Sequence, residues 1–176
     1  MLRTHRTRCF LLAAGVSLVA ATPVMADQPA GPKLVPFKAS YSGTYRAQVI
    51  PPHVIITGTG GQGHATQLGN FELANRILVN LVRGPVQGCP VPGTTEAFAA
   101  TLTGANGDAI VLEGTGHGCQ TGPTTVSVVD TVQVTGGTGR FEGATGSITV
   151  HTAVDQAAGS EVIDFEGLIS RPGSGS

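Results

Sequence analysis

Apolar and polar residues alternate with a period of two along most of the chain. The first clear run covers residues 37–49, where small, aromatic and aliphatic residues take every second position and polar residues lie between them. Such alternation is typical of a β-strand with one buried and one solvated face. The apolar face of this predicted strand consists of Phe37, Ala39, Tyr41, Gly43, Tyr45, Ala47 and Val49.

The same pattern recurs in short segments separated by turn-forming residues. Pro51-Pro52 ends the first run, and Asn106-Gly107 between two alternating runs favours the tight primed turn of a β-hairpin. The proline-rich residues 84–93 and the segment 116–122 are expected to be loops, and the chain is expected to turn again at 156–160. Further strands are predicted at 54–59, 96–103, 109–116, 126–134, 147–154 and 162–170.

Residues 64–83 fit two different periodicities. A helix would place Leu68, Phe71, Asn75, Leu78 and Val82 on one face. Two strands, at 64–70 and 71–83, would instead place every second residue from Phe71 to Leu81 on one face, with Asn75 among them. Gly69 and the β-rich surroundings favour the two strands.

About eight or nine short strands in series predict an all-β domain. Threonine, valine and glycine dominate the composition, with 26 glycines and no tryptophan, and this is a β-type composition. A sheet of this size either splits into a β-sandwich or closes on itself, and closure removes exposed edges. We expect a closed antiparallel barrel of about eight strands, with a sandwich as the alternative.

The stretch 134–150 (VTGGTGRFEGATGSITV) is the most distinctive part of the sequence. A dense set of glycines surrounds Phe141 and lies between two valine- and threonine-rich runs. It predicts a tight corner between two strands that buries the Phe141 ring. Arg140 is expected to pair with Glu142 or to cap the end of the barrel.

This corner resembles the signature hairpin of the allene oxide cyclase-like barrel proteins, a family of small eight-stranded antiparallel barrels. Relatives carry a glycine-glycine-x-glycine-x-phenylalanine-x-glycine-x-x-glycine pattern there. The matching residues are Gly136, Gly137, Gly139, Phe141, Gly143 and Gly146.

Other segments also resemble this family. Residues 34–37 (LVPF) resemble the start of the family's first strand, and 63–71 (GHATQLGNF) and 106–108 (NGD) resemble its secreted bacterial members of unassigned function. The dirigent proteins have a similar barrel. In the plant cyclases the catalytic carboxylate lies on a segment before Leu-Val-Pro-Phe, and that segment is replaced here, so the resemblance implies the fold and carries over no catalytic residue.

The first 26 residues have the features of a secretory signal peptide. Three arginines precede a short apolar run at 9–21, and small or apolar residues at 23–26 offer a cleavage site. The run is too short for a membrane-spanning helix, although an uncleaved anchor is the alternative. We therefore expect export to the periplasm or the extracellular space, a lead-in at 27–36, one barrel domain at 37–170 and a flexible tail at 171–176.

Cys89 and Cys119 remain after the predicted cleavage. In an oxidising compartment a disulfide between them is the expected state. His117 lies two residues before Cys119, which leaves a metal site as the alternative. A zinc site needs four convergent ligands, and the other histidines are scattered, so no metal is expected.

Charge and motif spacing exclude several functions. Cleavage would leave seven basic and eleven acidic residues, a net charge of −4, without the clustered cations that nucleic acid requires. Gly58, Gly60 and Gly63 have the spacing of a dinucleotide-binding loop but lack the βαβ unit that such a loop needs. We expect no cofactor and no membrane span in the mature chain, and a homo-oligomer remains open.

A few polar residues fall on predicted apolar faces. Asp130 is the main candidate, because it shares its face with four valines, and a buried carboxylate must be paired, hydrogen-bonded or protonated. Asn75, Tyr41 and Tyr45 are further candidates for lining a cavity. A bonded core position is the structural alternative for each, so no catalytic residue is assigned, with Asp130 the weak candidate.

Three functions fit these observations. The first is a secreted module that binds a small hydrophobic molecule in or at the mouth of the barrel. The second is an isomerase or cyclase that acts on an unsaturated lipid-like or polyketide-like substrate. The third is a non-catalytic envelope or assembly protein with a filled barrel.

Overall fold

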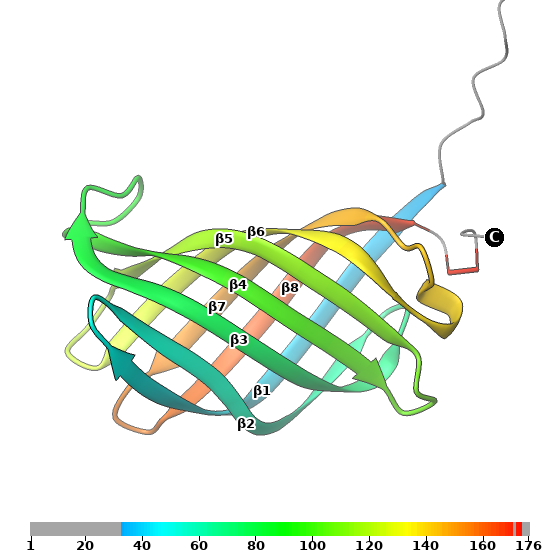
Figure 1. Cartoon of the computed structure of the whole chain (residues 1–176), viewed down its shortest axis with the longest axis horizontal. Coiled ribbons are helices and arrows are strands. Elements are labelled where there is room, and N and C mark those ends of the chain that lie inside the picture. Colours follow the sequence, from blue (N-terminus) through cyan, green and yellow to red (C-terminus); the bar gives the residue numbers. More distant parts are fainter. Residues whose placement is uncertain (1–32, 171, 174–176) are drawn as a thin grey trace, which may run out of the picture. The chain divides into compact units, whose positions relative to one another are not determined.

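Eight antiparallel strands close into a barrel (Figure 1). The structure is a computed structural model that describes residues 33–170, 172 and 173. Each strand pairs with the next, and β8 returns to pair with β1. The strands are β1 (Leu34–Ile50), β2 (His53–Ala65), β3 (Gly69–Gly84), β4 (Gly93–Gly104), β5 (Ala109–Gln120), β6 (Thr125–Thr138), β7 (Gly146–Asp155) and β8 (Ser160–Ser170).

Pairing of the first strand with the last decides between the two predicted architectures. The ladder runs from Leu34 opposite Ser170 to Thr44 opposite Ser160, so neither β1 nor β8 has a free edge. The predicted closed barrel is confirmed, and the sandwich alternative is wrong because a sandwich keeps open edges. Within residues 33–170, 172 and 173, no helix has the length and apolarity needed to cross a membrane.

The period-two pattern places one face of each strand inside the barrel. On β3 every second residue from Phe71 to Val79 is buried, so the two-strand interpretation of this region is right and the helix is wrong. On β6 the side chains of Val128, Asp130, Val132 and Val134 are buried as the alternation predicted.

Several predicted boundaries are wrong. The expected strand at 64–70 does not exist as a unit, because β2 ends at Ala65 and β3 begins at Gly69. The strand predicted at 54–59 continues through its glycine cluster, where the register with β3 shifts between Thr57 and Gly63. Residues 116–120 were expected in a loop but extend β5, and residues 34–36 of the lead-in already belong to β1.

The glycine corner closes one end of the barrel. After β6 a single 3-10 turn, η1 (Gly139–Phe141), turns the chain and buries the Phe141 ring completely. Gly139 has a φ of +60°, which favours glycine, and a Cβ at Gly137 would collide with the Ala109 carbonyl oxygen. Arg140 pairs with Asp108 at 2.6 Å, not with Glu142 as one expectation had it. We call this the closed end.

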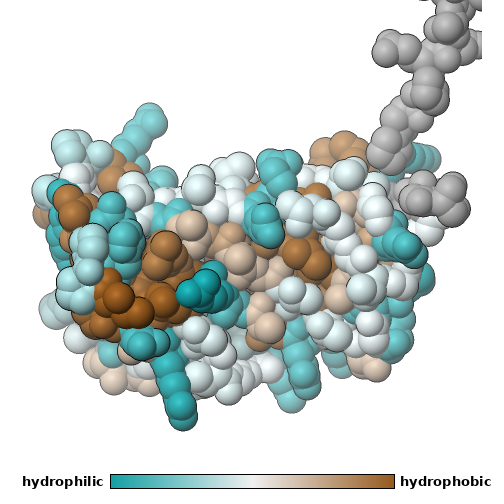
Figure 2. Space-filling model, viewed as in Figure 1, coloured by the Kyte–Doolittle hydropathy of each residue, from teal (hydrophilic) through white to brown (hydrophobic). Residues whose placement is uncertain are grey.

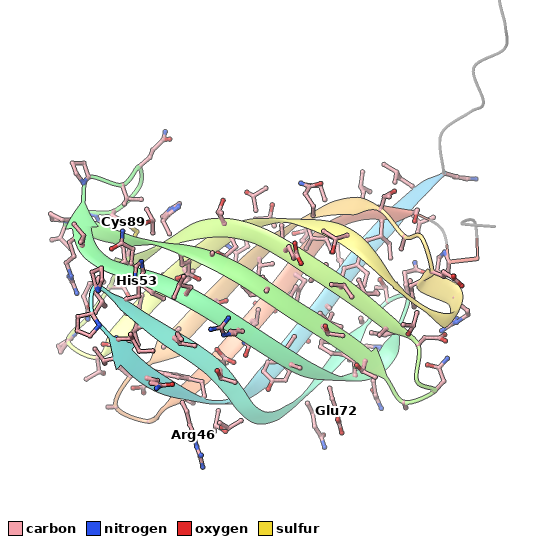
Figure 3. The ribbon with its side chains drawn as sticks, viewed as in Figure 1. Arg46, His53, Glu72 and Cys89 are labelled. Carbon is pink, nitrogen blue, oxygen red and sulfur yellow. A yellow bond between two sulfur atoms is a disulfide. The ribbon has the colours of Figure 1, made fainter. Side chains whose placement is uncertain are left out.

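The opposite end carries the β1–β2, β3–β4, β5–β6 and β7–β8 connections, and we call it the mouth. The predicted disulfide between Cys89 and Cys119 is confirmed, with a Cα–Cα distance of 5.2 Å. It ties the loop at 85–92 to the end of β5, and Figure 3 shows Cys89 at the same end as His53. The predicted signal peptide, the first part of the lead-in and most of the tail lie outside the described residues.

Replacing Phe141 with alanine should destabilise the protein by about 3–5 kcal/mol, because the ring is fully buried and the rigid corner cannot collapse around the cavity. Chemical denaturation measures the change. Leu168→Ala, at an exposed position on β8, is the control and should change the free energy of unfolding by less than about 0.5 kcal/mol. Equal effects of the two substitutions would contradict the role of Phe141 as a plug.

Candidate functional site

A hollow of about 290 Å³ opens at the mouth. Its position follows from the strand ends, since β1, β3, β5 and β7 finish here while β2, β4, β6 and β8 begin. Branched aliphatic side chains from five strands form most of its wall. These residues are Val49, Val54, Ile56, Val79, Leu81, Val126, Val128 and Val154.

Polar groups gather at the inner end of this hollow. Tyr45 and Glu96 line it, and both also line a second, smaller hollow of about 20 Å³ that Glu161 and Thr152 reach. Glu96 and Glu161 are buried, although both lie close to the start of their strands at the mouth. The mouth therefore leads from an apolar wall to a floor that carries carboxyl groups.

A glycine between Glu96 and Asp130, Gly116, allows their carboxyl groups to approach each other. Gly116 on β5 lies opposite Glu96 on β4 and opposite Asp130 on β6, so all three face inward at one level. A Cβ at Gly116 would collide with Asp130 Oδ1, so the Asp130 carboxyl occupies the space above this glycine. Without that space, the side chain on β5 would separate the two acids.

Glu96 and Asp130 influence each other's titration, and both have a raised pKa. Burial, reinforced by the nearby Asp130 carboxylate, raises the pKa of Glu96 to about 8. Burial also raises the pKa of Asp130 to about 6, while the hydrogen bond from Glu96 opposes that rise. Asp130 is 1% exposed, and among the described residues no amide, amine or hydroxyl group donates to it. Glu96, which has the higher pKa of the two, is the group placed to donate to Asp130.

Asn75 holds the third buried acid. Its Nδ2 donates to Glu161 Oε1 at 3.3 Å, and its Oδ1 accepts the backbone N–H of Gly58 at 2.6 Å. That second bond falls where β2 and β3 lose their register, so the Asn75 side chain replaces a missing ladder bond. Burial raises the pKa of Glu161, whereas the bond from Asn75 lowers it.

Tyr41 lies deeper in the barrel than Tyr45. Its ring stacks at 6.3 Å from Phe71, and its buried hydroxyl makes no hydrogen bond among the described residues. Burial and the Glu161 carboxylate raise the pKa of both tyrosines. Tyr45 contacts the mouth hollow and Tyr41 does not.

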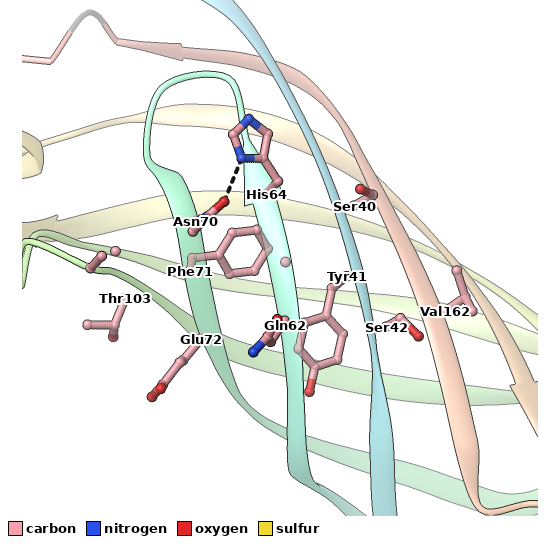
Figure 4. Close-up of a pocket in the computed structure, with 13 residues that line it drawn as sticks. Ser40, Tyr41, Ser42, Gln62, His64, Asn70, Phe71, Glu72, Thr103 and Val162 are labelled. Atoms are coloured by element: carbon pink, nitrogen blue, oxygen red, sulfur yellow. Dashed lines mark hydrogen bonds between the residues drawn. The ribbon is translucent and has the colours of Figure 1, made fainter.

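A larger hollow of about 810 Å³ lies along the barrel wall (Figure 4). Its lining includes outward-facing polar residues of β1, β2 and β3, with His64 and Asn70 joined by a 2.9 Å hydrogen bond. Tyr41 and Phe71 reach it between the glycine-rich residues of β2. None of the three buried acids contacts it, so we place the candidate site at the mouth.

Of the residues singled out from the sequence, Asn75, Asp130 and Tyr45 fall in or beside the polar floor. The sequence interpretation missed Glu96 and Glu161, which touch the hollows directly. The alternation contained a signal for both. Glu96 lies two residues before Phe98, and Glu161 lies two residues before Ile163, so each shares a strand face with an inward-facing apolar residue. Within the described part of the chain, no three histidine, cysteine, aspartate or glutamate side chains are placed to hold a metal ion.

Comparisons with known proteins add a structural likeness only. No protein family matches the chain, and no curated protein does. Its barrel is similar to the solved structure of a pterocarpan synthase dirigent protein, with a TM-score of 0.48 and 12% identity, over 86% of this chain and 99% of that chain. At this identity the likeness concerns the fold.

Stability should fall as the pH rises from about 4 towards 8. The folded protein raises the pKa of Glu96 from 4.5 to about 8 and that of Asp130 from 3.8 to about 6. The folded state therefore binds these protons more tightly than the unfolded chain, and this contribution is lost as the protons leave.

Glu96→Gln keeps a donor to Asp130 and does not titrate. It should raise the melting temperature at pH 8 by on the order of 5 °C and flatten the pH profile. Glu113→Gln, on the outer face of β5, is the matched control and should leave the profile unchanged. A wild-type protein that is more stable at pH 8 than at pH 5 would contradict the raised pKa values of Glu96 and Asp130.

Proposed function

We propose that this protein binds a small, mostly apolar molecule in the hollow at the barrel mouth. One observation carries the proposal: an apolar wall ends on a buried carboxyl group, Glu96, whose pKa is raised to about 8 by burial and the nearby Asp130. Pockets for small molecules typically combine apolar walls with a few placed polar groups. The export predicted from the N-terminal segment makes this a binding protein of the periplasm or the extracellular space.

The lining indicates the chemistry of the ligand. A volume of about 290 Å³ suits a small molecule, and the aliphatic wall favours a hydrocarbon-like body. Glu96 as a donor favours one hydrogen-bond acceptor, such as a carbonyl or ether oxygen, at the inner end. Arg83 and Gln120 at the outer edge of the hollow could contact a second polar group of the ligand near the solvent.

The distribution of packing supports binding over a filled scaffold. The closed half of the barrel is packed with large side chains, including Phe37, Leu102, Ile110 and Phe141, all fully buried. The mouth half has valines and the inward-facing glycines 114, 116 and 118 of β5 instead. A barrel with a purely structural role gains stability from filling this space.

Narrowing the mouth should weaken binding of an apolar probe. Val54→Trp places a large ring in the wall and should raise the dissociation constant of the neutral dye N-phenyl-1-naphthylamine by about tenfold or more, because the ring displaces the bound probe. Fluorescence titration measures this. Leu168→Trp adds the same ring to the outer face of β8, away from both hollows, and should leave the affinity unchanged. Equal affinities in both variants would place the dye elsewhere and remove the proposal.

The pair of carboxyl groups at the floor supports a second candidate function, an isomerase or cyclase. Glu96 can deliver its proton to a substrate oxygen or carbon, and the pair with Asp130 can take a proton back from another position. The exchange is balanced and needs no co-reactant. In this scheme Glu96 contacts the substrate and Asp130 sets the proton affinity of Glu96. Asp130 then acts through Glu96 and is not itself the general acid or base that the sequence suggested.

Glu96→Gln should then lower kcat at least about 100-fold for any unsaturated epoxide or polyketide-like ketone found to be turned over in a mass-spectrometric screen. Asp130→Asn should shift the pH dependence of kcat, because it removes the charge that raises the pKa of Glu96. Glu113→Gln is again the control. An unchanged kcat in Glu96→Gln excludes acid–base catalysis at this floor.

A further inference from the structure

Large aliphatic side chains are exposed around the mouth. Val49 at the end of β1 is 65% exposed and Val82 near the end of β3 is 67% exposed. These strand ends lie together, because β2 pairs with both and Leu81 N–H bonds to the Pro52 carbonyl oxygen. Figure 2 shows the patch at this end of the barrel. We define the apolar rim as Val49, Ile50, Leu78, Leu81, Val82 and Val91.

Arginines without carboxylate partners flank the apolar rim. On the outer face Arg46 lies opposite Thr57, which lies opposite Arg76, so the two arginines are close neighbours across β2. Arg83 adds a third exposed cation at the mouth, and in Figure 3 the Arg46 side chain points away from the barrel. In the described part of the chain none of these arginines forms a salt bridge.

The other half of the barrel has the opposite character. There Lys38 pairs with Glu166 at 2.8 Å and Arg140 pairs with Asp108. Exposed Glu72, Glu142 and Asp164 add negative charge away from the mouth. Arg46, Arg76 and Arg83, which form no salt bridge among the described residues, therefore lie towards the mouth beside exposed aliphatic residues, and Asp155 at the end of β7 adds one negative charge there.

We propose that the mouth docks on an anionic lipid surface, and that the bound molecule passes directly between the bilayer and the barrel. This inference rests on the proposed binding function. Aliphatic side chains beside arginines match the boundary between acyl chains and anionic headgroups. The apolar rim borders the opening of the hollow on the side of β1 and β3, where Val49 and Leu81 also line the hollow, so docking lets an apolar molecule cross there without entering water. Nucleic acid would match the arginines but not the aliphatic residues beside them.

Vesicle sedimentation tests the docking. The protein should bind vesicles of phosphatidylcholine mixed with phosphatidylglycerol more tightly than vesicles of phosphatidylcholine alone, and added salt should weaken the binding. Arg46→Gln with Arg76→Gln should lower the partition coefficient about 25-fold, at about fivefold for each arginine. Ile50→Ser with Val82→Ser should lower it about tenfold or more. None of these four residues lines the mouth hollow.

Matched control variants change the same chemistry away from the mouth. Lys33→Gln with Lys38→Gln removes the same charge, and Val162→Ser with Leu168→Ser removes similarly exposed aliphatic residues of β8. Both controls should keep wild-type partitioning. Wild-type partitioning in the mouth variants, or equal binding to both kinds of vesicle, would overturn the proposal.

A second copy of the chain is the competing occupant of the apolar rim. Two results together would favour the second copy over the lipid surface. The wild type would form a dimer in sedimentation velocity that Ile50→Ser with Val82→Ser dissociates, and the wild type would not bind vesicles. Dye affinity measured without vesicles separates this inference from the binding function. The dye affinity should be unchanged in all four double variants. Vesicle binding can therefore be lost while the mouth hollow still binds the dye.

Discussion

Pairing between β1 and β8 is the constraint on which the rest of this structure depends. It turns a row of hairpins into a tube, so one face of every strand must fill a single enclosed space. The closed half meets this demand with large side chains and with Phe141 from the glycine corner. The mouth half does not, because glycines on β5 and valines on the neighbouring strands leave a hollow.

Enclosure also determines the chemistry of the polar floor. Glu96, Asp130 and Glu161 lie inside the barrel, and no lysine or arginine side chain of the described residues pairs with them. A buried carboxylate without a cation is costly, and the pKa values rise in response. The outcome is a pair of carboxyl groups, Glu96 and Asp130, with raised pKa values at the inner end of an apolar hollow.

The two ends of the barrel are built for different tasks. At the closed end Lys38 and Arg140 are paired, and a buried ring stops the tube. At the mouth the disulfide holds the loop at 85–92 against β5, while aliphatic residues and arginines remain uncovered. This asymmetry connects the pocket with the surface from which we propose it is loaded.

Local pattern alone predicted most of the strands, the inward faces of β1, β3 and β6, the glycine corner and the disulfide, because alternation, turn chemistry and cysteine pairing are properties of short segments or simple counts. It did not locate the shifted register of β2 at Thr57 and Gly63, nor the continuation of β5 past Gly116. It also missed Glu96 and Glu161. Whether an inward-facing residue at a strand end is buried depends on the stagger of neighbouring strands. That Gly116 opens the gap between Glu96 and Asp130 depends on the register of three strands at once, which only the closed barrel decides.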